Sequence, residues 1–248
     1  MSGAVLIVIL ISSLAYILGG ALVLFKKNWS SQGLSSLTAL SAGLLLSIAI
    51  LDLIPDTSAE LANNSVFIML GFLIMYGIHI WSKMKASESD ANGTDYHEKE
   101  AFTGLSAGML VHNFFEGLAI GMSYAVNFHF GVLVSVALIV HKIPEGLSYT
   151  SAMLASLRNR GKTAVFLLIQ GAFIWLGAGS AVFLWDVRNI GEQGVAVILS
   201  MIAGIFLYLG GTSLLPVANA KPFPSVPYFF LGGVVFYFIF HDLATALG

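Results

Sequence analysis

The chain has 248 residues, of which 57% are hydrophobic and only 10% are charged, and its mean hydropathy is +0.88. A soluble domain carries charge on about a quarter of its residues, so this composition excludes an ordinary soluble globular protein. The formal net charge of −2 and the lack of a basic stripe indicate no nucleic-acid partner, and the absence of cysteine excludes disulfides and thiolate metal ligands.

Long apolar runs predict an all-α integral membrane protein with eight transmembrane helices, because a helix needs roughly 20 apolar residues to cross a bilayer. The first run lacks a basic start and a small-residue cleavage site and is followed by Lys26 and Lys27, so we interpret it as an uncleaved span rather than a signal peptide. The predicted helices cover about residues 4–25, 34–55, 65–82, 101–125, 130–154, 163–185, 194–216 and 226–247.

The distribution of Lys and Arg predicts the orientation of these helices. Nine of the 11 basic residues fall in the loops after the first, third, fifth and seventh helices, whereas the loops after the second, fourth and sixth hold only Arg188. By the positive-inside rule the first set of loops faces the cytoplasm, which places both termini outside an inner or plasma membrane. The longest of them, at about residues 83–100, is polar and is expected to be a mobile cytoplasmic loop.

A faint internal repeat relates the second helix to the seventh. Gly43 and Gly204 are each followed twelve residues later by a proline, Pro55 and Pro216, with a polar residue three positions before it. On the predicted topology these two helices run in opposite directions. We therefore expect helices 1–3 and 6–8 to be inverted repeats around helices 4 and 5, a common transporter plan with its site near the bilayer midplane.

The fourth and fifth helices each carry a histidine and a glutamate four residues apart, followed by glycine. The segments are His112-Asn113-Phe114-Phe115-Glu116-Gly117 and His141-Lys142-Ile143-Pro144-Glu145-Gly146. Positions i and i+4 share one face of a helix, and both histidines lie about twelve residues into antiparallel spans, so the four side chains are expected to converge at mid-membrane. Ionisable groups at this depth mark ion or substrate pathways, and imidazole with carboxylate suits Zn²⁺ first and Fe²⁺, Mn²⁺, Cd²⁺ or Co²⁺ next.

The two segments resemble the signature of the ZIP (Zrt-, Irt-like) family of divalent metal transporters, whose fourth and fifth helices carry His-Asn-x-x-Glu-Gly and His-x-x-Pro-Glu-Gly patterns. The ends of the second and seventh helices and the eight-helix layout are similar too. The resemblance implies a single transmembrane transporter domain over residues 1–248, not an enzyme, that moves metal toward the cytoplasm by an elevator-like or rocking motion. It also implies zinc as cargo rather than cofactor, downhill or proton-linked movement, and often a homodimer.

Two positions depart from the two-metal form of the family site. Lys142 stands where a ligand such as Asn or Asp is found in relatives, and Gln170 stands where a Glu often completes a second metal. A lysine ammonium can supply the charge of a missing second ion, although a snorkelling side chain is the alternative interpretation. We therefore expect one transported ion, with Lys142 replacing the second and Gln170 hydrogen-bonded to the central carboxylates. The expected metal-site residues are His112, Asn113, Glu116, His141 and Glu145.

Two further polar residues are candidates for the ion pathway. Asp52 lies near the outer end of the second helix, where it is expected to attract ions at an entrance whose rim Asp56 and Glu60 make acidic. Interfacial solvation is the alternative role for Asp52. Ser213 holds the matching place in the seventh helix but lacks the acid that relatives often carry, so it offers little at an exit.

Other functions stay open from the residues alone. An intramembrane metallohydrolase would use a bound metal to activate water, but it needs an open coordination position and a general base, and the chain lacks His-Glu-x-x-His. A proton-coupled carrier of an organic solute would use the same His and Glu side chains as relays. A purely structural interpretation is that these side chains only hold the fourth and fifth helices together by buried hydrogen bonds.

Overall fold

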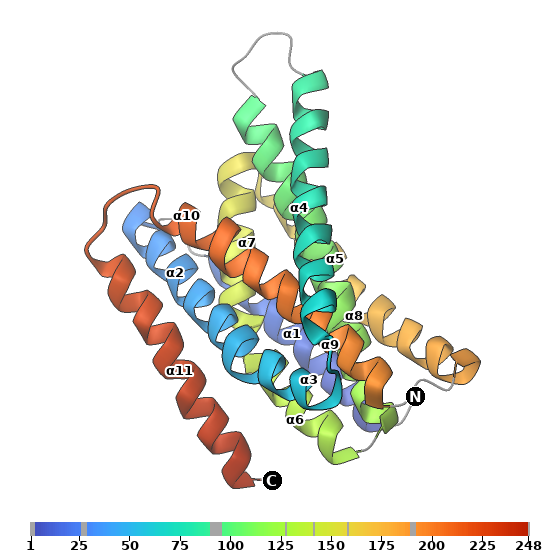
Figure 1. Ribbon diagram of the computed structural model, residues 1–248. Helices are drawn as coiled ribbons and strands as arrows, with labels where there is room; N and C mark the ends of the chain where they lie inside the picture. The colour runs from blue at the N-terminus through green and yellow to red at the C-terminus, as the bar shows by residue number, and fades with distance from the viewer. Residues whose placement is uncertain are drawn as a thin grey trace.

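The computed structural model describes residues 3–25, 29–89, 96–126, 128–140, 142–157, 159–188 and 192–247. Within these ranges the chain is helical and contains no strand (Figure 1). The elements are α1 (Gly3–Phe25), α2 (Ser31–Ser47), η1 (Ile48–Leu53), α3 (Ile54–Glu60), α4 (Asn64–Ser89), α5 (Tyr96–Val126), α6 (Phe128–Val140), α7 (Lys142–Leu157), α8 (Arg160–Arg188), α9 (Glu192–Tyr208), η2 (Leu209–Leu214), α10 (Leu215–Ala218) and α11 (Ser225–Leu247).

Five helical stretches in the described part of the chain are long and apolar enough to cross a membrane. Large apolar side chains such as Leu10, Leu70 and Leu168 are exposed along them, as expected where lipid rather than water surrounds a helix. The chain is therefore a multi-pass membrane protein. The five stretches are Gly3–Phe25, Ser31–Glu60, Asn64–Met84, Arg160–Leu184 and Gln193–Ala218, and Ser225–Ile239 is a shorter apolar helix.

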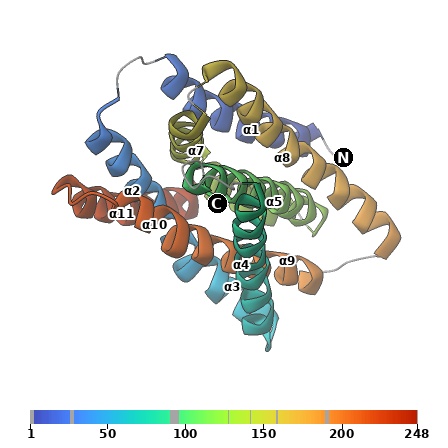
Figure 2. The same ribbon diagram turned by 90° about the horizontal axis from the view of Figure 1, so that it is seen from above.

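The helices pack in two groups that meet at α5. In the first, which we call the α5 group, α5 packs along α8, and α1 packs along α7 and α8. In the second, the α2 group, α2 packs along α11 and α4 packs along α9. Figure 2 shows α1, α7 and α8 on one side of α5, with α2, α9 and α11 on the other. The groups join where α4 and α9 contact α5 and where α2 contacts α7.

Two stretches of π-helix interrupt the long helices of the α2 group. α2 continues through η1 into α3, and α9 continues through η2 into α10. In both stretches the residue before a proline donates its N–H to the carbonyl five residues back, as Ile54 does to Ala49. Pro55 and Pro216 have no N–H to donate, so the carbonyl four residues before each loses its α-helical partner. The wider π turn is the local response to this loss.

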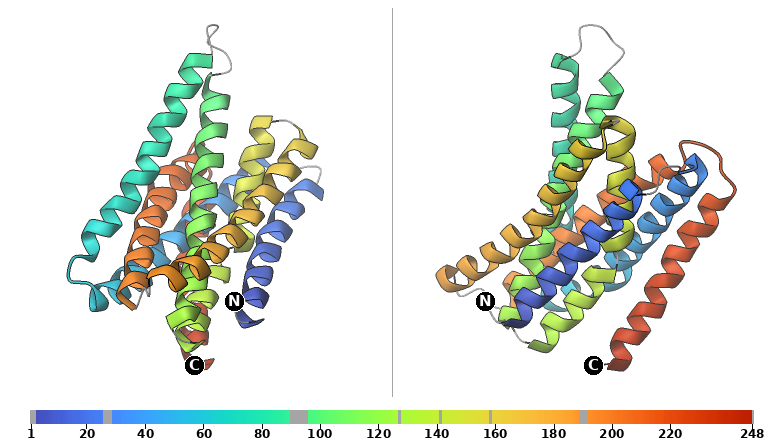
Figure 3. Two further views of the ribbon diagram at one scale, coloured as in Figure 1. Left: turned by 90° about the vertical axis from the view of Figure 1, so that its right-hand side faces the viewer. Right: turned by 180° about the vertical axis from the view of Figure 1, so that it is seen from behind.

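The predicted loop at about residues 83–100 is wrong in its bounds. α4 continues to Ser89 and α5 begins at Tyr96, while residues 90–95 lie outside the described residues. Figure 3 shows the end of α4 and the start of α5 extending beyond the rest of the molecule. The lysine, glutamate, methionine and alanine of these segments favour helix, so the two helices continue past the apolar spans. Of the other predicted segments, 4–25, 34–55, 163–185, 194–216 and 226–247 agree with described helical stretches to within about five residues at each end. The segment 130–154 covers two described helices, α6 and α7, and residue 141 between them lies outside the described residues.

Candidate metal centre

Six polar side chains from three helices of the α5 group meet in the interior. None of the six residues is more than 3% exposed, so water does not solvate their side chains and each needs a partner within the protein or an ion. α5 contributes three of them, α7 two and α8 one. They are His112, Asn113, Glu116, Lys142, Glu145 and Gln170.

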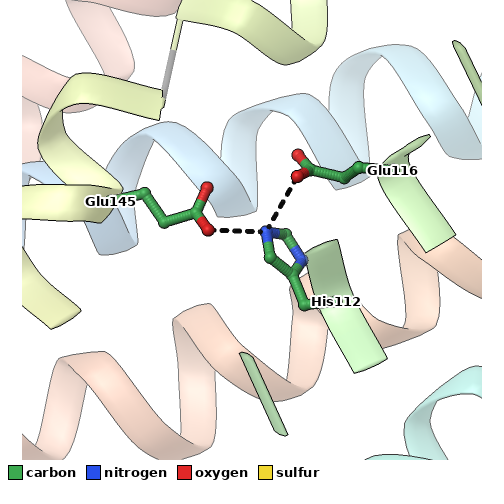
Figure 4. A group of neighbouring side chains, drawn as sticks. All are labelled: His112, Glu116 and Glu145. Carbon is green, nitrogen blue, oxygen red and sulfur yellow. Dashed lines mark ion pairs between the residues drawn. The ribbon is translucent and has the colours of Figure 1, made fainter. Parts of the chain in front are cut away.

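The imidazole of His112 lies between two carboxylates (Figure 4). Its Nε2 is 3.4 Å from Oε2 of Glu116, one turn along α5, and 3.2 Å from Oε1 of Glu145 on α7. The three possible ligand atoms all lie within 4.8 Å of one another. One nitrogen and two oxygens at this spacing form a donor set suited to a borderline divalent cation such as Zn²⁺. The fourth predicted ligand, His141, lies outside the described residues.

The glycines that follow the two glutamates fix the helices that carry them. A Cβ at Gly117 would overlap the carbonyl of Ile174 on α8, and a Cβ at Gly146 would overlap the carbonyl of Tyr16 on α1. Only glycine lets the backbones approach this closely, as small residues do between membrane helices. The backbone next to each glutamate is therefore packed directly against the backbone of a neighbouring helix.

Lys142 satisfies all three of its ammonium donors inside this cluster. Its Nζ pairs with Glu116, lies 2.9 Å from Oε2 of Glu145 and donates to Oδ1 of Asn113 at 2.8 Å. The Tyr16 ring lies 5.4 Å from Nζ, within the range of a cation–π contact. The alternative of a snorkelling lysine is wrong, because this side chain is fully buried.

The lysine also offsets the repulsion between the two carboxylates. With unit charges about 5 Å apart, as the ligand atoms of Glu116 and Glu145 allow, the repulsion is about 3 kcal/mol at an effective dielectric constant of ~20. A cation shared by both carboxylates converts this repulsion into two favourable contacts. Removing one partner from such a buried cluster leaves the others uncompensated, which typically costs about 3–5 kcal/mol.

Gln170 reaches the charged groups only through a neighbour. Its Oε1 accepts from Nδ2 of Asn113 at 3.1 Å, and its Nε2 donates to the Ser106 carbonyl at 3.0 Å and to the Tyr149 hydroxyl at 3.1 Å. The expectation that Gln170 bonds to the central carboxylates is therefore wrong. Its amide instead orients Asn113, which turns its oxygen toward Lys142.

The α2 group faces the centre with an apolar wall. A cavity of about 10 Å³, roughly the room of one water molecule, lies beside His112 and Glu145. The Phe206 ring packs on the imidazole of His112 with 5.0 Å between the ring centroids. Charged and apolar walls thus come from different groups of helices. The other residues that line the cavity are Leu45, Met109, Tyr149, Leu209 and Leu214.

Sequence reasoning missed three residues of the centre. Tyr16 and Tyr149 are buried, and their rings lie 6.2 Å apart. Tyr16 contacts Lys142 and Tyr149 contacts Gln170, so the two tyrosines connect the lysine to the glutamine. The carbonyl of Ser106 accepts a hydrogen bond from Gln170. No motif indicates them, because tyrosine and serine are ordinary residues of membrane helices. Only the packing of α1 against α7 brings Tyr16 to the lysine.

A second polar cluster lies between η1 and α11. Asp52 accepts a hydrogen bond from the hydroxyl of Tyr237, and its Oδ1 is 3.2 Å from Nδ1 of His241. The Asp52 side chain is 16% exposed and that of His241 is 43% exposed, so both can be reached from outside the protein. Asp56 and Glu60 are exposed nearby in the chain. We call Asp52, Tyr237 and His241 the outer cluster.

Ser213, like Asp52, is a predicted pathway residue that the structure does not bring to the centre. It lies in η2 and is partly buried. The adjacent Leu214 lines the central cavity, whereas Ser213 is not among the described residues that do. Neither Asp52 nor Ser213, its match in the predicted repeat, therefore belongs to the described part of the central cluster.

A buried histidine–carboxylate cluster in a multi-pass helical membrane protein is compatible with a divalent metal site within the bilayer. The family model described as ZIP Zinc transporter matches residues 79–240, which is more than half of the chain and includes both central motifs. The chain belongs to the ZIP zinc transporter family.

Several named relatives share part of this sequence. Zinc transporter ZIP4 of Mus musculus is 31% identical over 112 residues, which are 45% of this chain and 16% of the relative. Zinc transporter SLC39A7 of Canis lupus familiaris is 30% identical over 160 residues, 60% of this chain and 33% of the relative. Zinc transporter ZIP13 of Pongo abelii is 26% identical over 147 residues, 59% of this chain and 44% of the relative. The chain thus spans less than half the length of each of these relatives.

Proposed function

We propose that this protein is a membrane transporter that carries divalent metal cations, most readily zinc, into the cytoplasm. The observation that carries the proposal is the buried triad of His112, Glu116 and Glu145, whose ligand atoms lie within 4.8 Å of one another. Membership of the ZIP zinc transporter family and the zinc transporters named above support zinc as the cargo. Iron, manganese, cadmium and cobalt ions use the same donor types and are secondary candidates.

The site holds one ion at a time in this proposal. His112, Glu116 and Glu145 are the described ligands, His141 is the fourth, and Asn113 lies at the edge of the site. The support is the position of the Lys142 ammonium, which contacts both carboxylates and leaves them no room for a second cation on that side. Gln170 adds no charge, since its amide is taken up by neutral partners.

The proposed architecture has eight spans, with α1, α2–α3 and α4 related by inverted repeat to α8, α9–α10 and α11. The two π stretches support it, because each begins five residues after its glycine, Gly43 or Gly204, and ends two residues before its proline. The glycines support it as well. A Cβ at Gly43 would overlap the Phe230 carbonyl on α11, and a Cβ at Gly204 would overlap the Ile68 carbonyl on α4. The second span, α2–α3, thus packs on the eighth span, α11, as the seventh span, α9–α10, packs on the third span, α4.

The proposed orientation follows from the basic loops, with both termini outside an inner or plasma membrane. The ends of α4 and α5 then extend into the cytoplasm, and the outer cluster around Asp52 lies on the side where ions enter. Residues 1–248 act as one transporter domain. A homodimer is carried over from the family resemblance alone.

Uptake of radioactive zinc into proteoliposomes tests the function directly. We expect the purified protein to accumulate zinc and Glu145→Ala to abolish accumulation while eluting as a folded protein in size-exclusion chromatography. Equilibrium dialysis should give one tightly bound central zinc per chain, and two would overturn the single-ion site. Solute accumulation without zinc flux would favour the organic-solute carrier, and metal-dependent peptide cleavage without flux would favour a metallohydrolase.

A further inference from the structure

The charged groups of the centre that the structure describes belong to one group of helices. Glu116 lies on α5, and Lys142 and Glu145 lie on α7, both in the α5 group. The described residues of the α2 group that face the centre are apolar, namely Leu45, Phe206, Leu209 and Leu214. Any movement of one group against the other would therefore carry the two carboxylates and the ammonium together past an apolar wall.

The charge of the empty site depends on Lys142. The two carboxylates and the ammonium sum to −1 in their charged forms, whereas the two carboxylates alone sum to −2. Charge that is held away from water without compensation is costly in a membrane, and the cost rises steeply with its magnitude. A bound divalent cation neutralises the carboxylates by itself, so only the empty site depends on the lysine for compensation.

We propose that Lys142 is a tethered counter-cation that lets the empty transport site return across the membrane without a co-transported ion. Its ammonium replaces, between Glu116 and Glu145, the cation that a lysine-free site would have to bring back. The contacts with Asn113 and the Tyr16 ring hold it there when the metal leaves. This inference rests on the proposed transport function and adds to it the step that resets the carrier.

Two modes of transport separate this role from a role in metal binding. Net uptake into zinc-free liposomes needs the empty site to return after each delivery. Exchange of external labelled zinc for internal unlabelled zinc uses only loaded crossings. A residue that serves the empty return affects net uptake alone, whereas a ligand or a packing residue affects both modes alike.

The decisive experiment compares both modes for the full chain and two variants in proteoliposomes, with radioactive zinc as the probe. Lys142→Met keeps the length of the side chain and removes its charge, and Lys142→Arg is the matched control that keeps the charge. For Lys142→Met we expect the ratio of net uptake to exchange to fall at least about tenfold, which corresponds to a barrier increase of about 1.4 kcal/mol. For Lys142→Arg we expect a ratio within about threefold of the unaltered protein.

An unchanged ratio in Lys142→Met, or equal loss of both modes in a folded variant, would overturn the proposal. If Lys142→Met does not fold, the unaltered protein provides a second measurement. Its net zinc uptake should persist when N-methylglucamine replaces all sodium and potassium, with thiocyanate as permeant anion, and internal pyranine should record no coupled proton flux. A requirement for any of these cations overturns the inference. Absence of zinc movement in either mode of the unaltered protein would instead overturn the proposed function itself.

Discussion

The same donor types occur at two depths of this molecule and are balanced in different ways. In the centre, His112 lies between Glu116 and Glu145, and none of the three side chains is more than 4% exposed. In the outer cluster, Asp52 contacts a histidine that is 43% exposed and a tyrosine hydroxyl. The centre contains a buried ammonium, and the outer cluster contains none. Where the carboxylates are fully buried, the protein supplies its own cation; where the carboxylate is partly exposed, a phenol and an imidazole contact it.

This difference separates the two tasks of a metal carrier. A dehydrated set of ligands replaces the hydration shell of an ion and can hold it during a crossing. A partly exposed carboxylate raises the local concentration of cations but is screened by salt and contributes little binding energy. Variants of the two clusters should therefore differ in the size of the effect and in its dependence on ionic strength.

The largest effect is expected for Glu145→Ala. It removes one of the three described residues proposed as ligands and leaves the Lys142 ammonium with one carboxylate fewer. Loss of residues that only orient metal ligands typically costs 10–100-fold, so loss of a ligand should lower zinc uptake by at least about 100-fold. Initial rates of radioactive zinc uptake at saturating and subsaturating zinc measure it. Glu60→Ala is the matched control, because that carboxylate is exposed, and uptake by this variant should stay within about twofold.

Normal zinc flux in a folded Glu145→Ala variant would remove the basis for the central site. A size-exclusion profile and a melting curve in detergent show whether the variant is folded. If Glu60→Ala were as impaired as Glu145→Ala, the contrast between buried and exposed carboxylates would fail as well.

The spacing of the central motifs carried most of the information about the site. The separation of four positions from His112 to Glu116 places both on one face of α5, and matched depth in the next span brings Glu145 to the same level. The burial of Lys142 follows from its position within an apolar run. These features were predictable because helix periodicity and bilayer thickness leave few ways to arrange them.

Other features depend on tertiary contacts that spacing does not specify. An amide such as Gln170 can pair with charged or neutral groups, and only the packing of α8 against α5 selects Asn113 and Ser106. Pro55 and Pro216 predict a disturbed helix, but not whether a kink or a π turn results. The helical ends of α4 and α5 were missed because their polar composition is equally typical of a loop.

A smaller effect is expected for Asn113→Leu, which keeps the approximate volume and removes the amide. Lys142 would lose its Asn113 acceptor and Gln170 its donor, so the ammonium would move within the cluster. Zinc affinity should fall about tenfold, the lower end of the range for residues that orient ligands. Isothermal titration of the purified protein measures it. Ser200→Ala serves as control, because that buried hydroxyl only bonds to the Ala196 carbonyl of its own helix.

The hydrogen bonds from Gln170 through Asn113 to Lys142 also predict the effect of Gln170→Leu. If Gln170 acts through Asn113, the double variant Asn113→Leu/Gln170→Leu should have the same zinc affinity as Asn113→Leu alone, because both changes interrupt one chain of contacts. Additive losses in affinity would show that Gln170 contacts the ion or its ligands by another route. That result would contradict the neutral role assigned to its amide.

The smallest effect is expected in the outer cluster, for Asp52→Asn. This change removes a charge that attracts cations but no ligand of the centre, so the zinc concentration at half-maximal uptake should rise while the maximal rate stays unchanged. Interactions of exposed charges amount to about 0.2–1 kcal/mol, which corresponds to a change of about 1.4- to fivefold. Uptake titrations at two ionic strengths measure it, with Tyr237→Phe as the control that removes the hydrogen bond and keeps the carboxylate.

Ionic strength decides whether Asp52 attracts ions or binds them. The screening length falls from about 30 Å at 0.01 M to about 8 Å at 0.15 M, so an effect on attraction should shrink as salt is added. A direct ligand would show a loss that salt does not reduce, because a coordinated ion leaves no solvent between the charges. Equal loss at both salt concentrations, approaching that of Glu145→Ala, would make the outer cluster a second binding site and would end the contrast between the two depths.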